Sequence, residues 1–454
     1  MKINKGIIKS IYAYEILDSR GYPTVACKIK TKEGYTAIAM VPSGASTGER
    51  EALELRDGDK TRFMGKGVLK AVNNVNKKIA PYIVGKKVSV LQQTELDKLM
   101  IKLDGTANKA NLGANAILSV SIAACKCAAL VKNVPLYKYI KTALANNKDK
   151  TYTMPVPMLN VINGGAHADN TIDFQEFMFM PVNAPSIREA CRIASECFHS
   201  LAKLLKQNKF NTSKGDEGGF APLLKDAEQA LELMVQAVKN AGYKPGIKNG
   251  DVAFAMDTAC SELYDNDTHK YTFEKAIAAG IKNKSNGVKT TDQMIAYLKS
   301  LTTKFPIISI EDGLSENDRL GWKKWTKEQG NKLQIVGDDL YCTNPTIVNE
   351  GIAGKWSNSV LIKLNQIGTV TETVRTILAA QKAKWTAVVS HRSGETEDSF
   401  IADFAVGMGT GQIKTGSMSR SERIAKYNRL MEIEDELGSN AKYKKLAVFN
   451  NIKI

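Results

Sequence analysis

The sequence predicts an α/β fold, in which a small α+β domain precedes a (β/α)8 barrel that begins ββαα. Three short apolar runs support this prediction, because each ends on charged residues and helix-like segments separate them. Alternating strands and helices are typical of parallel α/β arrays. The runs are Ile307–Ile310 before Glu311 and Asp312, Leu333–Gly337 before Asp338 and Asp339, and Ser359–Ile362 before Lys363.

The charged ends of these runs predict a reaction site. In (β/α)8 barrels the carboxyl ends of the strands gather at one mouth, where these enzymes place their catalytic residues. One such end could be an acid that caps a helix. Three in succession favour chemistry at the mouth.

The chain length of 454 residues predicts two domains, which we expect at residues 1–145 and 146–454. The first contains strand-like runs and then helical patterns, including Ala114–Val131, and the polar run Asn146–Lys150 is the candidate linker. In the second, the runs Val156–Ile162 and Phe174–Pro181 lie too close for a crossover helix. They should be antiparallel neighbours, followed by helices at Ser186–Gln207 and Lys225–Ala241.

Composition indicates a soluble protein, with 43% hydrophobic and 24% charged residues. No apolar run approaches the roughly 20 residues that span a bilayer, and the first ten residues lack the apolar core of a signal peptide. The seven cysteines are scattered, without metal spacing. We interpret them as buried thiols and expect a cytoplasmic location.

The net charge of +16 could attract nucleic acid, an anionic membrane or a small anionic substrate. The lysines are spread along the chain, without interleaved aromatic residues or a nucleic-acid motif. We therefore interpret the basic charge as a solvated surface and expect no specific nucleic-acid partner.

A glycine- and hydroxyl-rich stretch, Val41–Arg50, lies between the strands and helices of the first domain. It could be an ordinary surface loop. Its serines and backbone groups could also approach a phosphate or a metal, which would make it a lid over a neighbouring site.

Eleven motifs along nearly the whole chain resemble the enolase family. Enolases have a small α+β domain before a barrel that starts ββαα, in agreement with the order of the runs above. The motifs are EILDSRGYPTV, SGASTG, NGGAHADN, QEFM, KGDEGGFAP, AMDTACSE, SIEDGL, VGDDLYCTNP, LIKLNQIGT, SHRSGETED and GQIKTGS.

The resemblance implies reversible dehydration of 2-phosphoglycerate to phosphoenolpyruvate in glycolysis, with two Mg²⁺ per active site. Removing a proton beside a carboxylate concentrates negative charge, which divalent cations stabilise, as is general in the enolase superfamily. Carboxylate oxygens are ligands that suit Mg²⁺. The implied ligands of the first ion are Asp257, Glu311 and Asp338, and Ser46 is the implied ligand of the second ion, which arrives with substrate.

The resemblance also assigns roles around the substrate. Lys363 is the implied base, whose pKa we expect Mg²⁺ and Lys414 to lower, although a structural ion pair with an acid is the alternative. Glu217 is the implied acid for the departing hydroxyl and Glu176 its partner. Lys414 should contact the substrate carboxylate and hydroxyl. The implied substrate-binding residues are His167, Gln175, His391, Arg392 and Ser393, the last three on the phosphate side.

Three residues depart from the family pattern at the expected dimer contact. Tyr14, Ala26 and Glu432 stand where charged partners are common, so apolar contacts should hold a homodimer or larger assembly. Two other functions stay open: a related superfamily enzyme acting on another carboxylate, and a cell-surface protein that binds polyanions or plasminogen.

Overall fold

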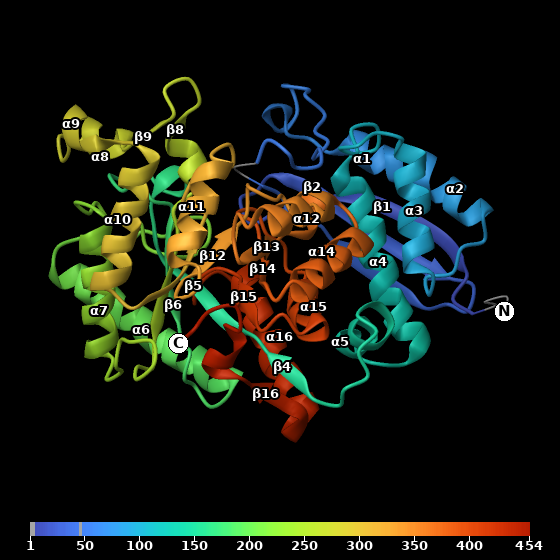
Figure 1. Ribbon diagram of the computed structural model, residues 1–454. Helices are drawn as coiled ribbons and strands as arrows, with labels where there is room; N and C mark the ends of the chain where they lie inside the picture. The colour runs from blue at the N-terminus through green and yellow to red at the C-terminus, as the bar shows by residue number, and fades with distance from the viewer. Residues whose placement is uncertain (1–4, 45–47) are drawn as a thin grey trace.

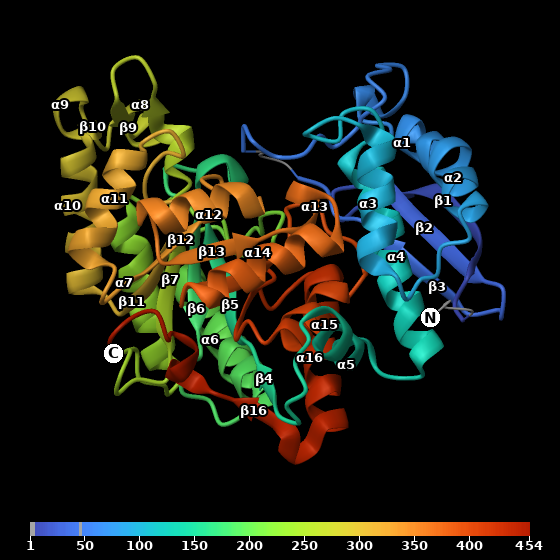
Figure 2. The same cartoon turned by 45° about the vertical axis from the view of Figure 1, so that its right-hand side comes forward.

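The structure is a computed structural model that describes residues 5–44 and 48–454. It has two parts, seen side by side in Figures 1 and 2: a sheet with helices from the first third of the chain, and a barrel from the remainder. Both views place the first part against one end of the barrel. The fold is therefore α/β overall, as predicted.

The first part contains a three-stranded antiparallel sheet in the order β1-β2-β3, covered by helices. The first five residues of β2 are all buried, and from Cys27 to Thr31 buried and exposed side chains alternate because successive residues of a strand face opposite sides. The first helix after the sheet, α1, continues directly into a π-helical turn, η2 (Val75–Ile79). The elements are β1 (Ile8–Leu17), β2 (Pro23–Thr31), β3 (Thr36–Met40), α1 (Leu69–Asn74), α2 (Ala80–Gly85), α3 (Gln93–Asp104), α4 (Ala114–Lys132) and α5 (Leu136–Tyr139).

Helix α4 corrects the expectation that no apolar segment approaches membrane-spanning length. The helix has 19 residues, and an 18-residue window within it has a mean hydropathy of 1.8, so it is long and apolar enough to cross a bilayer. However, 89% of that 18-residue window is buried inside the protein. A core helix surrounded by sheet and helices has the same composition, and that is the place α4 occupies (Figure 2).

The second part is a closed barrel in the order β11-β12-β13-β14-β15-β5-β6-β7. Strand β6 runs antiparallel to both β5 and β7, and the other neighbours are parallel. The predicted ββαα beginning is confirmed, with α6 and α7 after β6. The strands are β5 (Val156–Asn163), β6 (Glu176–Met180), β7 (Ala253–Asp257), β11 (Ile307–Glu311), β12 (Gln334–Gly337), β13 (Ser359–Ile362), β14 (Thr386–Ser390) and β15 (Gln412–Lys414).

Helices surround the barrel because their apolar faces pack on its outer side. Side chains cap several of them: Ser186 accepts from the Glu189 amide at the start of α6, and Asp318 accepts from the Gly321 amide at the start of α11. The covering helices are α6 (Ile187–Gln207), α7 (Ala227–Asn240), α10 (Thr291–Lys304), α11 (Arg319–Gln329), α12 (Pro345–Gly354), α13 (Leu364–Ile367), α14 (Val370–Lys382), α15 (Phe400–Met408) and α16 (Ser421–Leu437).

Short elements decorate the barrel at positions that the sequence patterns did not predict. A small sheet in the order β10-β9-β8 and the helices α8 and α9 form one projection (Figure 1), and β4 pairs with β16 near the chain end. Their bounds are β4 (Tyr152–Met154), β8 (Tyr264–Asp265), β9 (Lys270–Thr272), β10 (Val288–Lys289), β16 (Ala441–Tyr443), α8 (Glu274–Ala278) and α9 (Lys284–Gly287).

Buried ion pairs join the first part to the barrel. Lys109, almost fully buried, lies 3.1 Å from Glu372 of α14. Lys126 of α4 lies 2.7 Å from Asp398. Because Lys109 and Asp398 are buried and would be costly to leave unpaired, these contacts help to hold the two parts against each other.

Candidate active site

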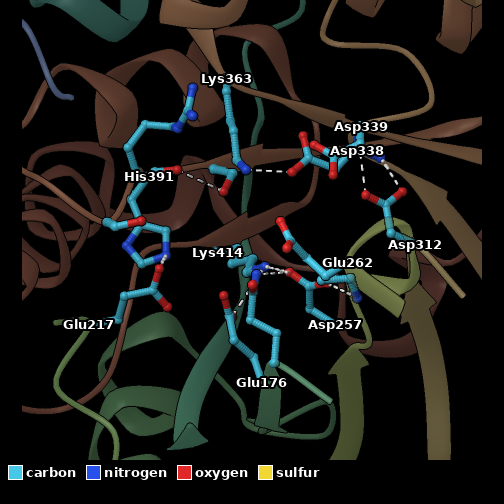
Figure 3. A pocket seen from close by; sticks show the side chains of 15 residues that line it. Glu176, Glu217, Asp257, Glu262, Asp312, Asp338, Asp339, Lys363, His391 and Lys414 are labelled. Carbon is cyan, nitrogen blue, oxygen red and sulfur yellow. Dashed lines mark hydrogen bonds and ion pairs between the residues drawn. The ribbon is translucent and has the colours of Figure 1, made fainter. Parts of the chain in front are cut away.

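The carboxyl-end mouth of the barrel holds a pocket that encloses roughly 500 Å³, open solvent included. Figure 3 shows its acidic and basic side chains pointing toward one another. The lining residues come from the ends of different barrel strands and the loops that follow them. They are Gln175, Glu176, Glu217, Asp257, Ala259, Glu262, Asp312, Asp338, Asp339, Lys363, Ser390, His391, Arg392, Ser393 and Lys414.

Strand direction explains how these side chains meet. Asp257 and Glu311 are the last residues of β7 and β11, and Lys414 is the last residue of β15. Because β6 is reversed, its first residue, Glu176, also lies at the mouth, paired with Asp257 in the strand register. Asp338 and Lys363 follow directly after β12 and β13.

Lys414 is the centre of a buried cluster of charges. Its Nζ atom lies 3.0 Å from Asp257, 3.0 Å from Glu311 and 3.2 Å from Glu176. Burial works to lower the pKa of Lys414, but the carboxylates of Asp257, Glu176 and Glu311 outweigh it and raise the pKa well above its usual value. Lys414 is therefore a permanent cation at this mouth.

Lys363 forms a short ion pair with Asp338. Burial works to lower the pKa of Lys363, and Arg392 adds to this effect, but the Asp338 and Glu311 carboxylates together raise the pKa on balance. The sequence analysis expected a lowered pKa and treated the ion pair as the alternative. The ion pair is what the structure shows, because Asp338 ends the neighbouring strand and reaches the ammonium.

The mouth contains more carboxylates than fixed cations. Burial, followed by repulsion from neighbouring acids, raises the pKa values of Glu176, Glu311, Asp312 and Asp339. Asp338 differs: burial works to raise its pKa, but Lys363 lowers it on balance. Because burial and neighbouring acids raise the pKa values of these four carboxyl groups, a bound cation would stabilise their ionised forms.

Divalent cations with oxygen ligands fit this donor set. Oxygen atoms of Asp312, Asp338 and Asp339 lie within 4.8 Å of one another, so that all three could contact one ion. This group shares Asp338 with the predicted ligands. It does not contain the other two, Asp257 and Glu311, whose carboxylates accept hydrogen bonds from Lys414.

Glu217 and His391 meet on the opposite side of the pocket from Asp338 (Figure 3). His391 Nε2 lies 3.6 Å from Glu217 Oε1, and Asn160 Nδ2 donates to Glu217 Oε2 at 2.8 Å. The buried carboxyl groups of Glu176 and Glu217 interact closely, and after burial the charge of Glu217 is the next cause that raises the pKa of Glu176. Such a carboxyl pair tends to hold one proton between its members.

The other predicted substrate-binding residues lie at the same mouth with one exception. Gln175 donates to Asp257 at 3.4 Å. Arg392 and Ser393 follow β14 and line the pocket, and Arg392 contacts Glu51 at 2.9 Å and Asn365 at 3.0 Å. His167 ends the short helix η4 (Gly165–His167) after β5, but its side chain is not described, and Ser46 lies outside the described residues.

Several residues of the site were not predicted from sequence. Asp312 accepts from the amides of Asp338 and Asp339, both at 2.9 Å, and thereby joins the ends of β11 and β12. Its signal was present, since it is the second acid of a strand-end pair. Gln366, which donates to Asp338 at 2.8 Å, and Glu51 and Asn160 had no local signal because partners far along the chain bring them to the site.

Fold and site together define a barrel enzyme with a small N-terminal domain and an acid- and lysine-rich mouth. Two family models match the chain: the N-terminal domain of enolase over residues 8–140 and the C-terminal TIM barrel domain of enolase over residues 151–452. The chain therefore belongs to the enolase family and is an enzyme of that family, a lyase of glycolysis.

Curated relatives agree with this assignment over nearly the full length. An enolase of Malacoplasma penetrans is 65% identical over 446 residues, which cover 98% of both chains. An enolase of Mycoplasmoides gallisepticum is 62% identical, with coverage of 99% of this chain and 94% of the relative. An enolase of Mycoplasma pneumoniae is 60% identical, covering 98% and 97% respectively.

Proposed function

We propose that this enzyme catalyses the reversible, Mg²⁺-dependent dehydration of 2-phosphoglycerate to phosphoenolpyruvate. One observation carries the proposal: Lys363 and Lys414 project from strand ends into a pocket whose buried carboxyl groups surround them. The reaction removes a proton from C2 and hydroxide from C3, so that water leaves and a double bond forms. It needs a base, an acid and concentrated positive charge at one mouth.

Asp257, Glu311 and Asp338 would hold the first Mg²⁺, and Ser46 would contribute to holding the second. When bound, the two ions supply positive charge that stabilises the charge developing on the substrate carboxylate. The raised pKa of Glu311 supports this assignment, since its carboxylate is stabilised by any added cation.

Lys363 is the proposed base and takes the C2 proton on Nζ. In this structure the Nζ atom is held by Asp338, which raises the pKa of the lysine. If the Asp338 oxygens bound a metal ion instead, the Nζ atom of Lys363 would be released. Burial and the positive neighbours Arg392 and Lys414 would then lower the pKa of Lys363. The metal ligand and the base are thus coupled through one carboxylate.

Glu217 and Glu176 act together on the departing 3-hydroxyl. The proton that they hold converts the leaving hydroxide into water. Lys414, a permanent cation beside Glu176, would contact the substrate carboxylate and hydroxyl. His391, Arg392 and Ser393 would face the phosphate, while Gln175 and the loop residue His167 would close on the substrate from the hairpin between β5 and β6.

Two variants separate the half-reactions. Lys363→Ala should abolish exchange of the C2 hydrogen with solvent. Glu217→Gln should retain that exchange and lose overall turnover, by about 10²–10⁴ in rate, as is usual for a positioned acid or base. Turnover is followed by the absorbance of phosphoenolpyruvate. Absence of turnover with saturating Mg²⁺ would overturn the proposed function, and equal loss of exchange in both variants would overturn the division of roles.

We further propose a cytoplasmic homodimer whose chain divides into domains near residues 145 and 146. The aromatic pair on β1 supports a weakly charged contact: Tyr12 and Tyr14 stack at 6.1 Å, and Tyr12 is 59% exposed. Glu432 bonds to Arg429 of its own helix at 3.2 Å, and Ala26 is buried within its own sheet. The comparisons lend no support to a polyanion- or plasminogen-binding role.

A further inference from the structure

We propose that Arg423 is a positioning residue that fixes the tautomer of His391, so that His391 presents an N–H donor toward Glu217 and cannot serve as a base. Arg423 lies in α16, outside the strand ends that supply the pocket, and its side chain is fully buried. The inference deepens the proposed function of this site, but the tautomer can be measured without any turnover.

The argument starts from the contact between Arg423 and the histidine ring. The Nη1 atom of Arg423 lies within hydrogen-bond distance of His391 Nδ1. A guanidinium group carries only donors and keeps its proton in proteins. Nδ1 must therefore accept, and an accepting ring nitrogen bears no proton. The neutral ring then carries its single proton on Nε2.

The Nε2 atom points into the pocket toward Glu217. It lies 3.6 Å from Glu217 Oε1, and it makes no closer hydrogen bond within the described residues. The other carboxylate oxygen, Oε2, accepts from Asn160 at 2.8 Å. Asn160 thus holds one oxygen of Glu217 by a hydrogen bond, while Nε2 of His391 faces the other oxygen from 3.6 Å.

The charged groups around the ring favour the neutral form. Burial lowers the pKa of His391 well below its usual value; Glu217 opposes this, while Arg423, Lys414 and Lys363 reinforce it. These groups come from α16, β15 and the end of β13, and Glu217 from the loop before α7. The ring therefore stays singly protonated near neutral pH.

Arg423 also joins the two loops that carry these residues. It donates to the carbonyls of Arg392 and Ser393, both at 2.6 Å, and to the carbonyl of Asp216 at 3.2 Å. A purely structural role would need only these backbone contacts. The test must therefore report on the ring itself.

The proposal is tested by nitrogen NMR of protein labelled with ¹⁵N-histidine. The chain has only four histidines, so His391→Gln identifies the ring signals of His391 by their disappearance. We expect Nε2 protonated and Nδ1 unprotonated in the wild-type protein between about pH 6 and 8. A proton on Nδ1, or a second proton gained in this range, would overturn the proposal.

Variants then show whether Arg423 is responsible. Arg423→Met removes donor and charge, so the pKa of His391 should move upward and Nδ1 should become free to bind a proton. Arg423→Lys, which keeps a donor and a charge, should retain the wild-type tautomer and titration. Lys426→Met removes another buried cation one turn away, and it should leave the ring unchanged. If the tautomer and titration of His391 are unchanged in Arg423→Met, Arg423 does not fix the ring. If that variant does not fold, the proposal is tested by the tautomer of His391 in the wild-type protein.

Discussion

Lys414→Met should destabilise the enzyme strongly without Mg²⁺ and much less with it. The ammonium group is only 2% exposed and lies 3.0–3.2 Å from three carboxylates, so its removal leaves buried negative charge uncompensated. Loss of one partner from a buried ion pair typically costs about 3–5 kcal/mol. Methionine has a similar length, so the change removes charge with little loss of volume.

Added Mg²⁺ should recover part of this loss. Without the ammonium group, Asp257 and Glu311 attract a divalent cation more strongly, and each tenfold gain in affinity adds about 1.4 kcal/mol of stabilisation at a fixed, saturating Mg²⁺ concentration. Urea denaturation in EDTA and in saturating Mg²⁺, followed by circular dichroism, gives the deficit of the variant relative to wild type under both conditions.

Lys426→Met is the matched control for this experiment. Lys426 is fully buried and bonds to Glu395 at 2.9 Å, outside the carboxylate cluster. Its deficit should be similar in size and unaffected by Mg²⁺. If the Lys414→Met deficit is equally unaffected, or if Mg²⁺ rescues both variants alike, Lys414 is not the counter-ion of a cation site.

Three further predictions concern pH, thiols and assembly. In EDTA the free energy of unfolding, measured by urea melts at several pH values, should fall as pH rises from about 5 to 8. Burial raises the pKa values of Glu311 and Asp312 in the folded state, so the folded protein holds protons that the unfolded chain releases. Added Mg²⁺ should make this dependence on pH weaker. All seven cysteines are buried, and burial raises the pKa of Cys191 to about 12, so a thiol reagent should react slowly with native protein and rapidly after denaturation, whereas rapid native reaction would contradict the burial. Sedimentation should show an assembly larger than a monomer at both low and high ionic strength; dissociation by salt would mean that ion pairs and not apolar contacts hold it.

The sequence predicted the barrel elements well because strand ends carry a local signal. The predicted run Ser359–Ile362 coincides with β13, and the predicted helix Ser186–Gln207 matches α6 together with its capping residue Ser186. The runs before Glu311 and Asp338 likewise end at the mouth. Local patterning suffices for such elements, since apolar periodicity and capping act within a few residues.

Pairing between side chains could not be predicted in the same way. The ion pair between Lys363 and Asp338 forms because β12 and β13 are neighbours in the barrel. It raises the pKa of the lysine, whereas the sequence analysis expected a lowered pKa. Arg423 is a charged residue in α16, a type that local pattern places at the surface, yet it is fully buried. Its position follows from how α16 packs against the loop after β14, which no local pattern encodes.

Because strand β6 is reversed, a change in chain length has different effects in β6 and in the loop that joins it to β5. The loop from residue 164 to 175 closes a hairpin between β5 and β6 and contains the short helix η4, so insertions there lengthen a loop at the pocket entrance without changing the strands. Glu176 would keep its place, because its register is set by pairing with Asp257 on the far side of the strand. Removing one residue within β6 itself would turn the side chains to the opposite faces of the barrel wall and withdraw the acid from the pocket. A change in the length of this loop would therefore displace proposed substrate-binding residues such as Gln175, whereas a change in the length of β6 would displace the acid itself.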